Sequence, residues 1–164
     1  MQETPIKQTV TSYYEDDHDR LDELFKQFQQ LKRLNFMKAK EFFKEFKFGL
    51  QRHIIWEEEI LFPLFEQKTG ITQGPTEVMR QEHRIIGKYL EAIHEQVKVK
   101  NPDSDENEQL LLNVLLMHNQ KEEQILYPTI DRSLMDSERA EVFTTMKNMP
   151  KERYNFCCDH QGAI

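Results

Sequence analysis

Histidine and glutamate recur at helical spacing in two similar segments of the chain. HIIWEEEILFP begins at His53, and HNQKEEQILYP begins 65 residues later at His118. In each segment a glutamate, Glu57 or Glu122, follows the histidine by four residues. Side chains at that spacing lie on one face of a helix, one turn apart. Each segment therefore presents an imidazole beside a carboxylate, and both groups are metal ligands.

The same offset relates two further histidines. His18 and His83 are 65 residues apart, and each precedes the histidine of the next segment by 35 residues. The chain therefore reads as two similar helical hairpins, each with a lone histidine on one helix and His-x-x-x-Glu on the next. Apolar residues flank the His-x-x-x-Glu pair of the second predicted helix, so we expect this pair to face the core. Buried carboxylates without partners would cost several kcal/mol, and a bound metal ion removes that cost.

Counting the donors predicts a site for two ions. Four histidines give four bonds, and two bridging carboxylates give four more. Two octahedral ions need roughly twelve, so a bridging oxo or hydroxo group would leave about two positions open for a small ligand. Imidazole suits iron, zinc and copper alike. One His-x-x-x-Glu is common by chance, but its repeat in register favours a metal site over a scaffold that has lost its metal.

The spacing of apolar residues predicts an all-α fold. Apolar side chains recur every three or four residues through long stretches, which polar segments with glycine or proline separate. These patterns predict helices over about 9–34, 36–68, 76–99 and 108–127, with a shorter one over 137–149. Pro63 is expected to kink or thin the end of the second helix. We expect an antiparallel up-down-up-down four-helix bundle in residues 1–135, and a short C-terminal helix and tail in 136–164.

Composition and charge narrow the class of protein. The 164 residues carry a formal net charge of −7, which argues against general binding of nucleic acid or of anionic membranes. No apolar stretch approaches the length of a membrane span, and we expect no export signal. Cys157 and Cys158 are adjacent and cannot close a long loop, so we expect a reducing, cytoplasmic location. With His160 they lie in a tail that we do not expect to bind zinc.

The combined pattern H…HxxxEE…LFP…EH…HxxxEE…LYP resembles the hemerythrin-like HHE cation-binding domain over about residues 8–130. The resemblance implies a four-helix bundle with a non-haem di-iron site at its centre, whose two iron ions are oxo- or hydroxo-bridged. It also implies the roles of the six motif residues. The terminal iron ligands would be His18, His53, His83 and His118, and the bridging carboxylates would be Glu57 and Glu122.

Two departures separate the chain from the oxygen-carrying hemerythrins. Those proteins have a fifth histidine one turn after the third, where this chain has Gly87, which has no side chain to bind a metal. Their last carboxylate is an aspartate five residues after its histidine, where this chain has a glutamate after four. We therefore expect redox or sensing chemistry in place of reversible oxygen carriage.

Functions of different classes follow from the resemblance. The first is a metal-binding protein whose di-iron site binds or senses oxygen, nitric oxide or iron. The alternative is a redox enzyme that consumes peroxide or nitric oxide, or that aids iron–sulfur cluster repair. Its reductant would come from a partner, because no Gly-rich nucleotide-binding motif is present. Whether the protein is an enzyme stays open at this point, and a metal-free interaction module is a third interpretation.

Other polar residues near the motifs are expected to act differently. His94 lies three helical turns after His83, about 16 Å along the helix, which is too far to share the same ions. Glu58 and Glu123 directly follow the two motif glutamates, and we expect them to be solvated or to bond and orient the ligand imidazoles. Tyr14 lies one turn before the first histidine, where packing is its expected role.

Overall fold

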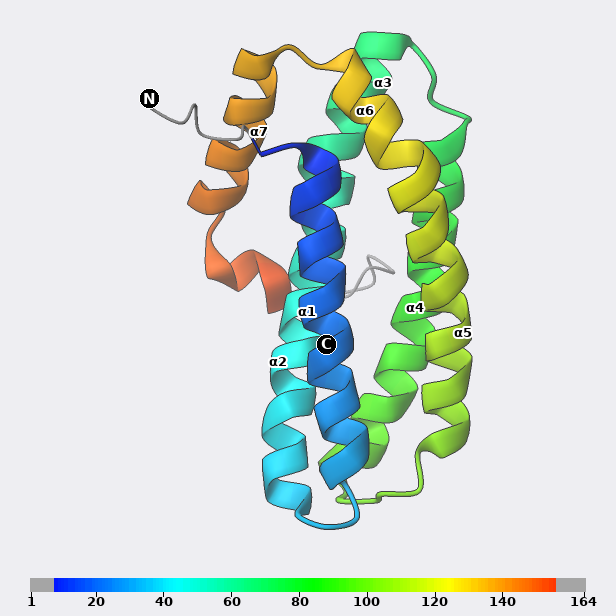
Figure 1. The fold of residues 1–164 in the computed structure, drawn as a ribbon. Coiled ribbons are helices and arrows are strands. Elements are labelled where there is room, and N and C mark those ends of the chain that lie inside the picture. Colours follow the sequence, from blue (N-terminus) through cyan, green and yellow to red (C-terminus); the bar gives the residue numbers. More distant parts are fainter. Residues whose placement is uncertain (1–7, 156–164) are drawn as a thin grey trace, which may run out of the picture.

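The protein is all-helical in the computed structural model, which describes residues 8–155 (Figure 1). Four long helical arms run antiparallel, which confirms the bundle predicted from the apolar spacing. The helices are α1 (Val10–Leu31), α2 (Phe36–Trp56), η1 (Glu57–Leu61), α3 (Phe62–Thr69), α4 (Pro75–Lys98), α5 (Asp105–Lys121), η2 (Glu122–Leu126), α6 (Tyr127–Ser133), α7 (Asp136–Asn148) and η3 (Lys151–Asn155). The second arm is α2, η1 and α3 in succession, and the fourth is α5, η2 and α6.

Each half of the bundle is a helical hairpin, with α1 packed against α2 and α4 against α5. Gly49 of α2 allows α1 to come close, because a Cβ atom there would lie 2.7 Å from Cδ2 of Leu21. The first helix was predicted to begin at about residue 9, and it begins at Val10. Thr9 caps it, because its side chain accepts a hydrogen bond from the Ser12 amide at 3.0 Å. The Asp131 carboxylate of α6 accepts hydrogen bonds from the backbone amides of Val10 and Thr11, the first two residues of α1, both at 2.9 Å. These contacts tie the start of α1 to the end of the second hairpin.

The second arm of each hairpin contains a π-helical turn that the apolar spacing did not predict. The turns η1 and η2 begin at Glu57 and Glu122, and the amide after each turn donates to the carbonyl of its glutamate, five residues back. Pro63 and Pro128 are the second residues after these turns. The wider turn relieves the clash that a proline ring makes with the carbonyl four residues earlier in an α-helix. Both arms therefore continue past their prolines, and the last arm extends beyond the predicted residue 127 to residue 133.

The C-terminal segment packs on the side of the bundle (Figure 1). α7 contacts η1, and η3 contacts α2. In η3, which the sequence did not predict, the Tyr154 hydroxyl accepts a hydrogen bond from the Trp56 indole at 2.8 Å. This segment therefore shares its core with the bundle. Cys157, Cys158 and His160 lie outside the described residues.

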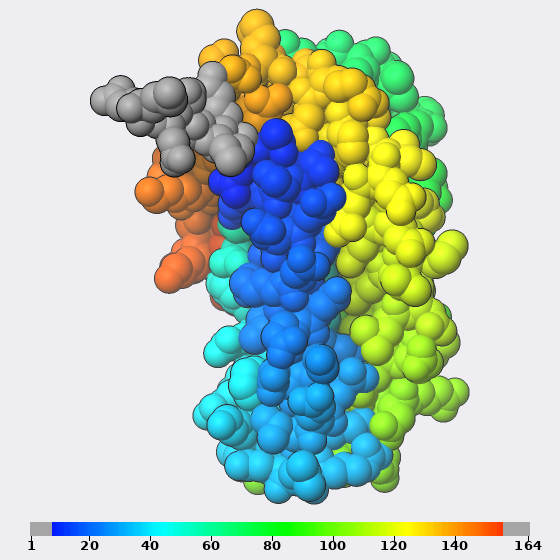
Figure 2. All heavy atoms as spheres, viewed as in Figure 1, coloured from blue at the N-terminus to red at the C-terminus, as the bar shows by residue number. Residues whose placement is uncertain are grey.

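Two hydrophobic clusters fill the bundle along its length. One gathers side chains from the start of α1 together with α3, α6, α7 and η3. The other lies toward the opposite end, where Phe25, Phe28, Phe43 and Phe46 pack ring against ring. Figure 2 shows atoms of α1 bordering those of the fourth arm, which closes this face of the bundle. None of the helices within residues 8–155 has the length and apolar character needed to cross a membrane.

Candidate metal centre

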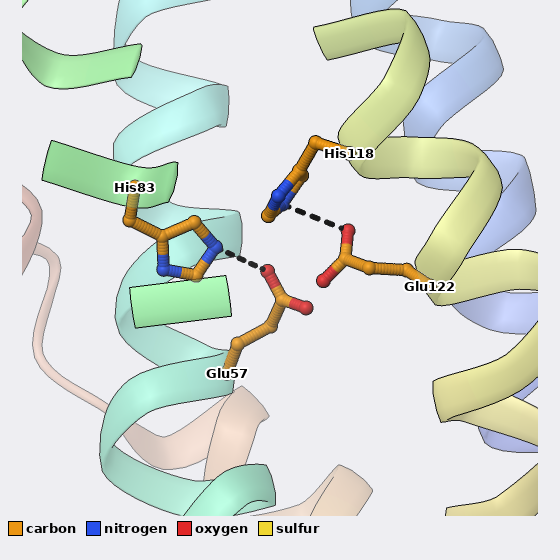
Figure 3. Close-up of side chains that lie close together, drawn as sticks. All are labelled: Glu57, His83, His118 and Glu122. Carbon is orange, nitrogen blue, oxygen red and sulfur yellow. Dashed lines mark ion pairs between the residues drawn. The ribbon is translucent and has the colours of Figure 1, made fainter. Parts of the chain in front are cut away.

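The structure brings all six predicted residues together between the two hydrophobic clusters. One histidine comes from each of the four arms, and a glutamate begins each π turn. We call this group the His/Glu cluster: His18, His53, Glu57, His83, His118 and Glu122. All six are at most 4% exposed. Figure 3 shows four of them, from α4, the end of α5 and the two π turns, pointing at one another.

Each imidazole of the cluster turns its Nε2 atom toward a glutamate. The Nε2–Oε1 distances are 3.3 Å for His53–Glu57, 3.4 Å for His83–Glu57, 3.4 Å for His18–Glu122 and 3.1 Å for His118–Glu122. The Nε2 atoms of His18 and His53 are 3.1 Å apart. Two atoms bound at right angles to an ion, each at about 2.1 Å, are about 3 Å from one another. The observed separations therefore suit ligands of a shared ion.

The other ring nitrogen of each histidine bonds a further carboxylate. We call these four residues the orienting carboxylates: Asp17, Glu58, Glu82 and Glu123. The distances from Nδ1 to the carboxylate oxygen are 2.7 Å for His18–Glu123, 2.8 Å for His53–Asp17, 3.0 Å for His83–Glu58 and 3.0 Å for His118–Glu82. Such a bond fixes the tautomer and the direction of the ring. Of the two roles expected for Glu58 and Glu123, the structure therefore supports orientation of the imidazoles.

The hydrogen bonds at Nδ1 determine that the Nε2 atoms are the ring nitrogens available to bind a cation. A neutral imidazole that donates from Nδ1 carries a lone pair on Nε2, and the lone pairs of His18 and His53 face each other across 3.1 Å. Facing lone pairs repel unless a cation or a proton lies between them. The carboxylates are also incomplete. Oε1 of Glu57 and both oxygens of Glu122 are buried without a hydrogen-bond partner among residues 8–155. These residues therefore fit a metal ion.

Without a metal ion, protons supply the positive charge that the buried glutamates require. Burial lowers the pKa of His53, but Glu57 and Asp17 outweigh it and raise this pKa to about 10. Burial likewise lowers the pKa of His118, but Glu122, Glu82 and Glu57 outweigh it and raise this pKa to about 10. Burial raises the pKa of Glu122, but the His118 imidazolium holds it well below its usual range. Protons and metal ions therefore compete for the same nitrogen atoms.

Tyr127 belongs to the site, although sequence reasoning missed it. Its buried hydroxyl donates to Oε2 of Glu57 at 2.9 Å and lies 3.2 Å from Nε2 of His53. Burial and the nearby glutamates raise the pKa of Tyr127, so the hydroxyl keeps its proton. The available signal was its place in the repeated Leu-aromatic-Pro motif. Tyr14 packs as expected, with its hydroxyl 3.7 Å from Sδ of Met146.

Two of the orienting carboxylates were also missed. Asp17 and Glu82 each directly precede a cluster histidine in the sequence and are 65 residues apart, so the repeat itself contained the signal. Each bonds the histidine of the neighbouring helix in its own hairpin. His94 stays apart from the cluster, as expected. It contacts Glu91 of its own helix at 3.3 Å and stacks on Phe43 with ring centroids 6.3 Å apart.

Known proteins resemble this chain across both hairpins. The hemerythrin HHE cation binding domain matches residues 9–130, which include the whole His/Glu cluster. The chain is 36% identical over 92 residues to the iron-sulfur cluster repair protein YtfE of Edwardsiella ictaluri, which is 51% of this chain and 41% of that protein. It is 28% identical over 141 residues to the protein of the same name from an Enterobacter species, which is 75% of this chain and 63% of that protein.

The chain spans less than two thirds of the length of either relative. No solved structure matches it. The family match, in contrast, covers both hairpins, both π turns and every residue of the His/Glu cluster. The chain therefore belongs to the hemerythrin HHE cation binding domain family.

Proposed function

We propose that the protein binds two iron ions in the His/Glu cluster. Support comes from two sets of ligand atoms, each set lying within 4.8 Å: Glu57, His83, His118 and Glu122 in one, and His18, His53 and Glu122 in the other. Because both sets include Glu122, its carboxylate is suited to bridge two ions. Glu57 lies close to histidines of both sets and is suited to the same role. The names of the two relatives, which repair iron–sulfur clusters, favour iron over other ions that accept this donor set.

The observation that carries this proposal is the convergence of imidazole lone pairs on buried, incomplete carboxylates. Iron bound to such groups supplies an open coordination position and a change of oxidation state. The chain itself prepares the site. The orienting carboxylates hold the four rings with Nε2 inward, and Tyr127 holds one oxygen of Glu57. The hydrophobic clusters on both sides keep bulk water out.

A small cavity beside the cluster favours a small ligand. Its volume is about 10 Å³, which is room for the centre of one water-sized molecule. Its wall includes His18, His53 and His118, together with Leu21, Asp22, Phe46, Leu50, Ile54, Ile86, Leu115 and Asn119. A diatomic molecule is close to this size, so the cavity favours a small ligand over a larger organic substrate. We therefore assign the di-iron site to binding or sensing of oxygen or nitric oxide, with iron itself as the other possible signal.

The test is a titration of the protein after anaerobic reconstitution with ferrous iron. Nitric oxide and oxygen are added separately while the absorption spectrum is recorded. We expect a ligand-dependent spectrum that saturates at about one small molecule per pair of irons. Leu115→Phe, which narrows the cavity, should weaken ligand binding and leave the iron content unchanged. A spectrum that neither gas alters would contradict the proposal.

A second candidate function is enzymatic, and similarity to the two YtfE proteins favours it. In this alternative the site consumes nitric oxide or peroxide, or aids iron–sulfur cluster repair, with electrons from a partner protein. Adding a chemical reductant together with excess nitric oxide or peroxide separates the two functions. Loss of many molecules per iron pair would support the enzyme. Loss that stops after one equivalent would support the binding or sensing protein.

A further inference from the structure

The ligand residues of the cluster and the carboxylates bonded to them follow the 65-residue repeat closely. Each histidine, each glutamate and each orienting carboxylate has a counterpart of the same chemistry in the other hairpin. The aromatic residue that follows each π turn does not. It is Phe62 in the first hairpin and Tyr127 in the second, and both are 0% exposed. Each half of the site therefore has one buried tyrosine without a tyrosine counterpart: Tyr127 in the second hairpin, and Tyr14 in the first, whose counterpart is Met79.

The two aromatic rings occupy equivalent places. Phe62 stacks on His83 with ring centroids 6.0 Å apart and an interplanar angle of 9°. Tyr127 lies 5.9 Å from the ring of His18, at 33°. His18 and His83 are counterparts in the repeat, so each aromatic ring packs against the lone histidine of the opposite hairpin. The hydroxyl of Tyr127 is thus the chemical difference between these two equivalent rings.

The hydroxyl acts on one glutamate and not on the other. Tyr127 donates to Oε2 of Glu57 at 2.9 Å, on the side of the cluster where His53 lies. Among the described residues, Glu57 keeps one buried oxygen without a hydrogen-bond partner, whereas both oxygens of Glu122 lack one. A carboxylate oxygen that accepts a hydrogen bond is less basic, and it donates less to a metal ion.

We propose that Tyr127 makes the two metal positions unequal, so that the position at His83 and His118 fills before the position at His18 and His53. This inference rests on the two-ion site proposed above. The set of ligand atoms around the first position includes both glutamates, whereas the set around the second includes only Glu122. Tyr127 is a positioning residue, because it acts on the second ion through Glu57.

The weaker position is also the one that can accept an external ligand. Both of its histidines, His18 and His53, line the small cavity, whereas only His118 of the other pair does so. An ion with fewer strong protein donors beside an open space is the one with a vacant coordination position. Tyr127 therefore directs small-molecule binding to one side of the site.

The test is a titration of chelator-treated protein with Co²⁺, followed by calorimetry and visible absorption. We expect the unaltered protein to bind two ions in steps whose dissociation constants differ by about tenfold or more. Tyr127→Phe should tighten the second step, because Oε2 of Glu57 becomes more basic without its hydrogen bond, and so bring the two constants closer together. Phe62→Tyr should weaken the first step, because it places a hydroxyl beside Glu122. The double exchange should restore two unequal steps with their order reversed.

Tyr14→Phe is the matched control. Tyr14 is equally buried and its ring packs on His53, but among the described residues its hydroxyl hydrogen-bonds only Sδ of Met146. Because Phe keeps the ring, both constants should stay unchanged even where stability falls. His118→Ala should remove the tighter step, and His53→Ala the weaker one. If Tyr127→Phe does not fold, Phe62→Tyr alone still tests the proposal.

Three outcomes would overturn the inference. One is equal constants in the unaltered protein, and another is a ratio that the variants at residues 62 and 127 leave unchanged. The third is a phenolate-to-iron absorption band in the ferric protein that Tyr127→Phe removes, because Tyr127 would then bind the metal directly. Fewer than two ions bound to the unaltered protein would instead contradict the proposed two-ion function.

Discussion

Two groups of buried charged side chains lie at different levels along the bundle. In only one of them do neighbouring side chains supply both the opposite charge and the hydrogen bonds that the buried carboxylate needs. At the end of the bundle where α1 ends and α5 begins, the side chains of Lys32 and Glu108 are each 2% exposed. Their charged atoms are 2.5 Å apart. Gln29 and Ser104 donate to the two oxygens of Glu108. In the His/Glu cluster, Glu122 is just as deeply buried, yet neither of its oxygens has a hydrogen-bond partner within residues 8–155.

The difference separates a structural use of buried charge from a functional one. The Lys32–Glu108 pair balances its own charge, and Asp105, Gln29 and Ser104 add hydrogen bonds to it, so it needs no ion from outside the chain. The two cluster glutamates face nitrogen atoms whose lone pairs point inward, so their charge must be balanced by protons or by metal ions. The two groups should therefore respond differently to mutation and to metal removal.

The largest expected effect is loss of metal from Glu57→Gln/Glu122→Gln. The exchange keeps the shape of both side chains and removes the two bridging charges, so metal affinity should fall by at least about a hundredfold. The metal-free variant should also be less stable than the metal-free parent near pH 7, because His53 and His118 lose the carboxylates that stabilise their protonated forms. Elemental analysis after dialysis and urea unfolding measure the two effects. Glu108→Gln is the control, and it should keep its metal and lose stability.

Lys32→Met should give the largest loss of stability. It leaves the Glu108 carboxylate buried without its cation, which costs about 3–5 kcal/mol in the free energy of unfolding. Urea unfolding should show the same loss with and without metal. Lys32→Met/Glu108→Leu should recover most of it, because no unpaired charge is left. A loss that metal loading reverses would mean that the pair and the His/Glu cluster are not independent.

The stability of the metal-free protein should fall as the pH rises. His53 and His118 have pKa values of about 10 in the folded chain, above the ordinary value of 6.5. Raised values contribute stability that is complete below about pH 6.5 and is lost as the pH passes through about 10. The urea midpoint of the metal-free protein should therefore decrease between pH 7 and pH 10. The metal-loaded protein should show a flatter profile, since metal ions replace those protons.

The smallest effect should come from the orienting carboxylates. Glu82→Gln and Glu123→Gln keep a hydrogen-bond acceptor near Nδ1 but remove its charge, so each should weaken metal binding about 10- to 100-fold. Competition with a chelator of known affinity measures this change. Glu41→Gln, an exposed position of α2, is the control and should leave affinity unchanged. Equal affinities in all three variants would show that the rings are held by packing alone.

The repeat was sufficient to predict the six cluster residues, because spacing alone places His53 and Glu57 on one helix face and the shared offset pairs the hairpins. The rest depends on geometry that spacing does not contain. The π turn η2 changes the angular position of Tyr127 relative to a continuous α-helix, so the direction of its hydroxyl could not be predicted from the sequence. Glu58 and Glu123 bond histidines of the opposite hairpin, which requires knowing how the hairpins dock.

The most direct test of the account is the number of iron ions that each chain holds. The protein is reconstituted with ferrous iron without oxygen, freed of excess metal, and analysed for iron and for protein by amino-acid analysis. Two irons per chain in the unaltered protein, and none in Glu57→Gln/Glu122→Gln, is the predicted result. No iron in the unaltered protein, or two irons retained by the double variant, would contradict the claim that the buried glutamates exist to hold a metal pair.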